Sequence, residues 1–177
     1  EAGYAATKPY RLNAADTGHF LTNYDQPLLT ALLEEVAGGT ANVITRAQLV
    51  KEQALLAKSP LVSTATFIDL LSAYVSEDND KVWSMLSGLI ADLKRFVDPD
   101  TPEERALKKL AAKVAGPLYK KLGWDKLPDE PESDTMLRAT ILGTMLYGED
   151  SGAIAESRQR YASQPLEAMD PELRDII

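Results

Sequence analysis

The sequence contains no cysteine and only one histidine, His19, and each shortage excludes a kind of chemistry. Without cysteine the chain can form neither a disulfide nor a thiolate nucleophile, and this composition fits a reducing compartment, so we expect a cytoplasmic protein. A histidine-based zinc site needs two or more imidazoles at a defined spacing such as H-E-x-x-H, which a single histidine cannot supply. We therefore expect His19 to be an ordinary turn or strand residue, and we expect no metal site in this chain.

Long hydrophobic runs and an excess of positive charge are also missing. No stretch approaches the ~18–20 apolar residues of a membrane span, so we expect no membrane partner. The net charge is −8, whereas a nucleic-acid binder needs a basic face, so we expect no nucleic-acid partner. The chain has 177 residues, enough for one folded core. It begins with glutamate and shows no signal-like segment, so we expect a fragment of a longer protein.

Acidic pairs are the remaining source of catalytic chemistry, because the sequence has no glycine-rich phosphate loop and no G-x-S-x-G element. The pairs are Glu34-Glu35, Asp78/Asp80, Glu103-Glu104 and Asp129-Glu130. Each stands at a predicted helix end or in a polar loop, where solvated carboxylates are expected, whereas a catalytic pair needs a cleft that shifts its pKa values. The Asp78-Asn79-Asp80 run lacks the glycine and the closing glutamate of a calcium loop. No catalytic residue is predicted, and a self-contained acid–base enzyme stays open as a minor alternative.

Residues 1–25 differ in pattern from the rest of the chain. Aromatic and aliphatic residues are separated there by polar residues around Asp16-Thr17-Gly18, which predicts a hairpin of two short extended segments. From Gln26 onward, apolar residues recur at intervals of three and four, as in helices. The sequence thus predicts a short β-type segment followed by an all-α region.

Helical periodicity continues from Gln26 to the end of the chain. Eight segments are predicted, over residues 26–37, 45–59, 63–75, 82–96, 101–122, 136–147, 154–161 and from 170 onward. Thr45 and Ser63 are the expected N-caps of the second and third segments, and Phe96 ends the apolar stripe of the fourth. Most connections are short, apart from the proline- and acid-rich loop 125–134, so sequential helices should lie antiparallel in a bundle or a solenoid. The unfinished last segment favours the solenoid.

The segment 101–122 has the strongest helix signals. Thr101 can cap it, Glu104 completes a capping box, and Gly123 ends it. Leucine and valine recur along one face, which must be covered by neighbouring helices. Pro117 falls inside the pattern, where it removes a backbone hydrogen bond, and we expect it to bend the helix.

Lysines form a basic strip on the same segment. They are Lys108, Lys109, Lys113, Lys120 and Lys121. A solvated helix face is the simpler interpretation of this strip, and contact with the carboxylates of a peptide is the alternative. Lys120 and Lys121 are the residues for which we predict peptide contact.

Four stretches carry motifs in a fixed order. They are Leu12-Asn13 with Gly18-His19-Phe20-Leu21-Thr22-Asn23-Tyr24-Asp25, Arg46-Ala47-Gln48-Leu49-Val50 with Ser63–Leu71, Pro117-Leu118-Tyr119-Lys120-Lys121-Leu122-Gly123-Trp124 with Leu137-Arg138, and Pro171-Glu172-Leu173-Arg174. All four resemble motifs of the zinc aminopeptidases of the aminopeptidase N family. In the same order, the family motifs are L-N…G-[FY]-[FY]-R-V-N-Y-D, R-A-Q-L-I…S-Y-x-x-A-L-D-L-L, P-L-Y-x-K-L-G-W with L-L-R, and P-x-x-L-R. Each motif alone is weak, but together they cover residues 12–177. Leu21 and Thr22 depart from the Arg-Val of the family pattern.

The resemblance implies a place in a larger architecture. In that family the N-Y-D segment joins a small β-domain to a C-terminal helical domain of armadillo- or HEAT-like antiparallel helix pairs in a superhelical array. Residues 1–25 would then be the end of the β-domain or a linker, and residues 26–177 the first part of a truncated C-terminal helical domain. The zinc ligands and the H-E-x-x-H glutamate of the family belong to a separate thermolysin-like domain. None of its motifs occurs here, so no catalytic or zinc residue carries over.

The resemblance also implies a function for the chain. It would be the non-catalytic C-terminal helical domain of a zinc-dependent aminopeptidase, which removes N-terminal amino acids from peptides. It would cap the active-site chamber and line the peptide channel, with Lys120 and Lys121 meeting peptide carboxylates. Its partners would be the catalytic domain of the same polypeptide, which holds the zinc, and peptide substrates. The alternative is a stand-alone HEAT-like interaction scaffold.

Overall fold

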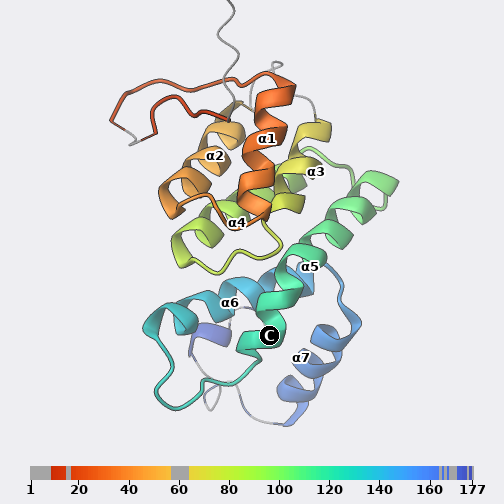
Figure 1. Cartoon of the computed structure of the whole chain (residues 1–177). Helices are drawn as coiled ribbons and strands as arrows, with labels where there is room; N and C mark the ends of the chain where they lie inside the picture. The colour runs from red at the N-terminus through yellow and green to blue at the C-terminus, as the bar shows by residue number, and fades with distance from the viewer. Residues whose placement is uncertain are drawn as a thin grey trace, which may run out of the picture. The chain divides into compact units, whose positions relative to one another are not determined.

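The computed structural model describes residues 9–14, 17–56, 64–163, 165, 167, 171–174 and 176 (Figure 1). Its elements are α1 (Gln26–Ala37), α2 (Val43–Leu56), α3 (Thr64–Ala73), α4 (Asp80–Lys94), α5 (Pro102–Leu122), α6 (Glu132–Tyr147), α7 (Ser151–Ser163) and the 3-10 helix η2 (Pro171–Leu173). The described residues contain no strand, so the predicted helical class is confirmed for them. The chain divides into two compact units, Glu1–Tyr74 and Val75–Ile177. The superhelical array and the boundary at residue 25 stay predictions.

The coil before α1 is the part of the first unit that differs most from expectation. The predicted short β-type segment is not shown, because residues 9–14 and 17–25 form no strand. The side chain of Asn13 closes a loop there: its Oδ1 accepts a hydrogen bond from the Gly18 N–H (2.7 Å), and its Nδ2 donates to the Gly18 carbonyl (2.9 Å). A side chain that pairs with both backbone groups of one residue replaces the strand-to-strand bonds that a hairpin would need. Asp16, in the expected turn, lies outside the described residues.

Helices α1 and α3 pack against each other in the first unit, and α2 also has buried apolar residues. The core residues are Leu29, Leu32, Leu33, Val36, Leu49, Val50, Phe67, Leu70, Leu71 and Tyr74. The hydroxyl of Tyr74 donates to the Arg46 carbonyl at 2.7 Å, which ties the end of this unit to α2. The predicted cap at Thr45 is wrong, because the Asn42 side chain accepts from the Thr45 N–H (2.9 Å) and α2 begins at Val43. The other predicted cap, Ser63, lies outside the described residues.

Helices α4, α5 and α6 form the core of the second unit. Trp83 on α4 is fully buried and donates its indole N–H to the Glu77 carbonyl at 2.8 Å. The apolar face of α5 is buried as predicted at four of its leucine and valine positions: Leu107, Val114, Leu118 and Leu122. The predicted place of Phe96 on the apolar face of the fourth helix is wrong. Phe96 is 71% exposed, because α4 ends at Lys94 and Phe96 lies beyond it.

The predicted caps of α5 are present. The Thr101 hydroxyl accepts from the Glu104 N–H (3.2 Å), and the Glu104 carboxylate accepts from the Asp100 N–H (2.8 Å), one residue earlier than in a standard capping box. Pro117 lies inside α5, and the helix continues past it to Leu122. Gly123 then takes a φ of 59°, a value that glycine adopts without strain, and the helix ends. None of the described helices is long and apolar enough to cross a membrane.

Candidate functional site

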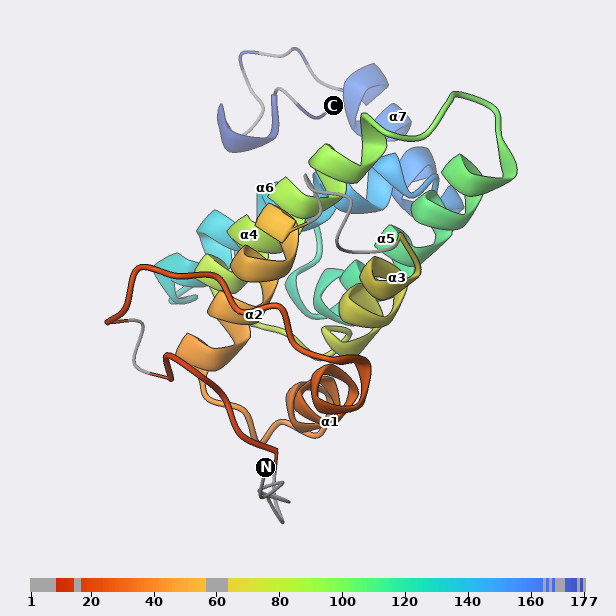
Figure 2. The ribbon, with the colours of Figure 1, turned by 90° about the horizontal axis from the view of Figure 1, so that it is seen from above.

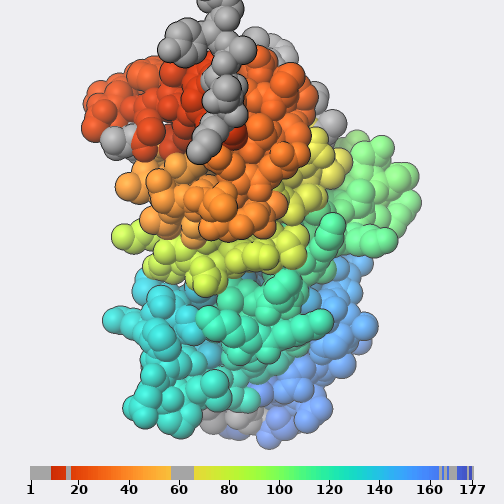
Figure 3. Space-filling view, in the orientation of Figure 1, coloured from red at the N-terminus to blue at the C-terminus, as the bar shows by residue number. Residues whose placement is uncertain are grey.

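Four cations lie along one face of α5. Arg105, Lys109, Lys113 and Lys120 follow one another at spacings of four, four and seven, which returns each to nearly the same side of the helix. All four side chains are exposed, and the stripe runs for about 22 Å at 1.5 Å per residue. The surface of α5, in green, can be followed in Figure 3. We call these four residues the α5 stripe.

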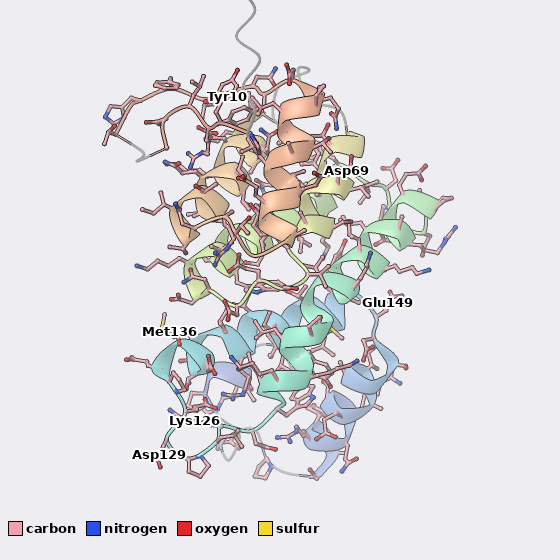
Figure 4. All side chains as sticks on the ribbon, viewed as in Figure 1. Tyr10, Asp69, Lys126, Asp129, Met136 and Glu149 are labelled. Carbon is pink, nitrogen blue, oxygen red and sulfur yellow. The ribbon has the colours of Figure 1, made fainter. Side chains whose placement is uncertain are left out.

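The other two lysines of the predicted strip lie away from the α5 stripe and have acidic partners. Lys108 bridges Glu104 (3.2 Å) and Glu149 (2.6 Å), and Figure 4 places Glu149 beside the first half of α5. The Nζ of Lys121 lies 3.6 Å from the Asp134 carboxylate at the start of α6. Lys120, by contrast, makes no ion pair within the described part of the chain. Of the two predicted contact residues, Lys120 is therefore the one whose charge is available to a ligand.

A buried ion pair holds the loop that follows α5. Arg138 on α6 donates to both carboxylate oxygens of Glu130, at 2.7 and 2.6 Å, and the two side chains are 4% and 6% exposed. The same guanidinium donates to the Leu122 carbonyl (3.2 Å), which satisfies a backbone group at the end of α5. Hydrogen bonds from Arg138 are the main cause that lowers the pKa of Glu130 to about 2. The loop 123–131 is thus tied to α6 and to the end of α5.

A second arginine fixes the other side of the same loop. Arg160 on α7 donates to both oxygens of Asp125 (2.8 and 2.7 Å) and lies over the ring of Trp124, 5.3 Å from its centroid. The hydrogen bonds from Arg160 lower the pKa of Asp125. The indole N–H of buried Trp124 donates to the Tyr119 hydroxyl at 3.1 Å. Tyr119 and Trp124 therefore pack the helix end, and Lys120 projects from a region held in place on both sides.

Comparison with known sequences gives the family of the chain. A sequence model of the ERAP1-like C-terminal domain family matches residues 10–177, nearly the whole chain. The chain belongs to the family of ERAP1-like C-terminal domains. This match and the relatives reported next confirm the resemblance to the aminopeptidase N family that the four motifs indicate.

Curated relatives of this ERAP1-like domain are named aminopeptidases. The chain is 34% identical over 183 residues to aminopeptidase N of Lactococcus lactis subsp. lactis (strain IL1403), covering 99% of the chain and 21% of that protein. It is 30% identical to aminopeptidase N of Lactobacillus helveticus, covering the whole chain and 20% of that protein, and 24% identical to aminopeptidase 2 of Candida albicans, covering 95% and 19%. The chain spans about a fifth of the length of these relatives.

The sequence singles out two kinds of side chain in this domain, possible metal ligands and acidic pairs. No group of three His, Cys, Asp or Glu side chains is placed there to hold a metal ion, and His19 is exposed in the coil before α1. Two members of the predicted acidic pairs, Glu104 and Glu130, have shifted pKa values, and both shifts are downward. A lowered pKa means that the carboxylate form is favoured, whereas a general acid needs a raised pKa that keeps it protonated. Lys120 and Lys121 stay predicted contacts.

The sequence does not predict the ion pair of Glu130 and Arg138, which holds the loop after α5. Glu130 stands in a stretch of prolines and acids, where solvation was the natural expectation, and Arg138 falls inside an otherwise apolar helix pattern. An arginine among apolar positions is itself a signal, because an ionised side chain is rarely buried unless it is paired. The pairing partner, eight residues away, depends on the path of the loop and leaves no local pattern.

Proposed function

We propose that this ERAP1-like domain is the non-catalytic C-terminal part of a zinc-dependent aminopeptidase that removes N-terminal amino acids from peptides. The supporting observation is the match of residues 10–177 to the C-terminal domain family, together with relatives that are named aminopeptidase N. In this proposal the zinc is held by a separate catalytic part of the longer polypeptide, as the resemblance to the aminopeptidase N family implies. A cytoplasmic location and contact with the catalytic domain are part of the same proposal.

The role proposed for this domain is to cap the active-site chamber and to line the peptide channel. The α5 stripe supports it, since an exposed row of cations on an otherwise acidic chain attracts the carboxylates of a peptide. Lys120 is the proposed principal contact, because it has no acidic partner among the described residues. Lys121 is the weaker one, because the carboxylate of Asp134 lies 3.6 Å away and already compensates its charge.

Charge reversal in the whole enzyme tests this role. Lys120→Glu is expected to raise KM for peptides of several residues about twofold to fivefold, which corresponds to the ~0.5–1 kcal/mol of an exposed ion pair. Lys121→Glu should have a smaller effect. Both variants should keep the wild-type kcat. Their KM for a single-residue chromogenic amide should also stay at the wild-type value, because so short a substrate does not reach the channel wall.

Lys126→Glu provides the matched control. Lys126 is exposed in the loop between α5 and α6 (Figure 4), so its reversal changes the net charge equally but lies off the α5 stripe. Peptide KM values that are unchanged in Lys120→Glu, or equally raised in Lys126→Glu, would contradict the proposed contact.

A further inference from the structure

The α5 stripe carries four positive charges that no carboxylate of the described residues neutralises. The sequence has 27 Asp and Glu residues against 19 Lys and Arg residues, and the neighbouring Lys108 and Lys121 both have acidic partners. Within the described part of the chain the stripe forms no ion pair, and Arg105 donates to the backbone carbonyl of Asp100 at 2.8 Å. Like charges four residues apart on a helix repel each other and destabilise it. Contacts among the described residues do not offset this repulsion, which points to a negatively charged ligand.

Small residues lie between the cations on the same face of α5, a helix that can be followed from a second side in Figure 2. Ala112 and Gly116 follow Arg105 by seven and eleven residues, which is close to two and three full turns. A Cβ built on Gly116 would meet no atom within 4 Å, so the space beside this residue is open. Where side chains are this small, the backbone of a ligand can approach the helix closely.

A hollow beside the first half of the stripe gives such a ligand a place to lie. Its cavity volume is about 380 Å³, and it is lined on α5 by the first two cations of the stripe and on the other side by residues 148–151. The two acids of that wall are engaged within the chain: Glu149 pairs with Lys108 at 2.6 Å, and Asp150 accepts from the first turn of α7 at 2.9 Å. The charge that stays available to a ligand there is the positive charge of the stripe.

The spacing of the cations matches alternate residues of an extended peptide. Arg105, Lys109 and Lys113 are four residues apart, which is about 6 Å along a helix that rises 1.5 Å per residue. An extended chain rises about 3.3 Å per residue, so side chains on the same side of it are about 6.6 Å apart. Acidic side chains at alternate positions therefore meet successive cations, whereas consecutive acidic side chains point to opposite sides. The distance of about 22 Å from Arg105 to Lys120 corresponds to about seven extended residues.

We propose that the α5 stripe makes peptides with acidic residues at alternate positions the preferred substrates of the parent enzyme. The peptide lies extended along α5, and its carboxylates pair with Arg105, Lys109 and Lys113, while a peptide of about seven residues or more also reaches Lys120. This inference rests on the proposed function, because it needs the aminopeptidase and its peptide channel. It goes beyond general attraction of carboxylates, because it names a sequence pattern and a length.

Two peptides of the same composition and length test the pattern in the parent enzyme. They share their first four residues, beginning with leucine, and carry three aspartates among alanines afterwards, at alternate positions in one peptide and consecutively in the other. The alternating peptide should have a KM about threefold lower at low salt, with the same kcat, because each exposed ion pair adds a little binding energy. The difference should vanish in about 0.5 M sodium chloride, since salt screens exposed charges. Equal KM values at low salt, or a difference that persists in salt, would overturn the proposal.

Substitution of Lys109 locates the preference on the stripe. Lys109→Gln removes the middle one of the three evenly spaced cations, so the KM values for the two peptides should become equal. Lys109→Arg should keep the difference, because it keeps the charge. Lys126→Gln is the matched control, because Lys126 is exposed in the loop after α5 and lies off the stripe. A preference that survives Lys109→Gln, or that Lys126→Gln also abolishes, would overturn the assignment to the stripe.

Hydrolysis of a single-residue chromogenic amide separates this inference from the proposed function. A parent protein that releases no N-terminal residue from the amide or from either peptide would overturn both. A parent that cleaves the amide and both peptides, with equal KM values for the two peptides, would overturn the alternating pattern alone.

Discussion

The ion pair of Glu130 and Arg138 shows how single residues hold the candidate site. Both side chains are almost fully buried, and the carboxylate also accepts from the Leu127 N–H (3.0 Å) and the Thr135 hydroxyl (2.8 Å). A buried carboxylate with this many donors is stable only in its charged form. Loss of either partner leaves the other buried without compensation, which destabilises a protein more than loss of an exposed pair does.

Acid should therefore weaken the fold through Glu130. Its pKa is about 2 in the folded chain against an ordinary 4.5, so the stabilisation is complete above pH 4.5 and is lost as the pH falls toward 2. Glu130→Gln should be less stable than wild type at pH 7, and the difference should shrink by pH 3. Urea unfolding at the two pH values measures it. Asp129→Asn is the control, since Asp129 is exposed in the same loop (Figure 4), and a pH dependence that Glu130→Gln retains in full would refute the assignment.

At the scale of elements, the approach of α5 to the end of α6 depends on one glycine. Gly148 follows α6, and a Cβ built on it would lie 2.7 Å from the Ala112 Cβ and 2.9 Å from both the Ala112 N and the Lys108 carbonyl oxygen. Two of these atoms are backbone of α5, which cannot move aside as a flexible side chain would. The absence of a side chain at Gly148 therefore lets the helices meet.

Gly148→Ala should accordingly destabilise the second unit by about 1–3 kcal/mol, the usual cost of overpacking. Gly88→Ala is the matched control: Gly88 is exposed within α4, and its added Cβ would meet no atom within 4 Å. The control should gain about 0.5–1 kcal/mol, because alanine loses less backbone entropy than glycine in a helix. Thermal unfolding followed by circular dichroism measures both, and equal effects of the two substitutions would contradict the close contact.

The sequence predicts the helices well and their ends less well. Periodicity and capping residues predict α5 from Thr101 to Gly123, because both kinds of signal are local. The sequence predicts a cap at Thr45, whereas the structure has the cap at Asn42. Both residue types cap helices, and only the fold shows which one the first turn follows. The alternation of residues 1–25 predicts a hairpin, but strand pairing needs a partner that local sequence does not contain. Local sequence does not predict the roles of Gly148 and Glu130 for the same reason, since both depend on contacts between elements.

At the scale of the whole molecule, the account places this domain in a much longer polypeptide. The α5 stripe fits the proposed lining of a peptide channel, and the coverage of about a fifth of each relative fits a part of a longer chain. A stand-alone HEAT-like scaffold would share the helices but would not line a peptide channel. The two accounts therefore differ in the size and the activity of the native protein.

The most direct test is the native mass and activity of the polypeptide recognised by an antibody against this chain. We expect a band of about five times the 19.4 kDa of the chain, since the chain covers 21% of its Lactococcus relative. That band should co-purify with release of N-terminal amino acids that a zinc chelator abolishes and added zinc restores. A native band near 19.4 kDa, without such release, would contradict the account and leave a free helical scaffold.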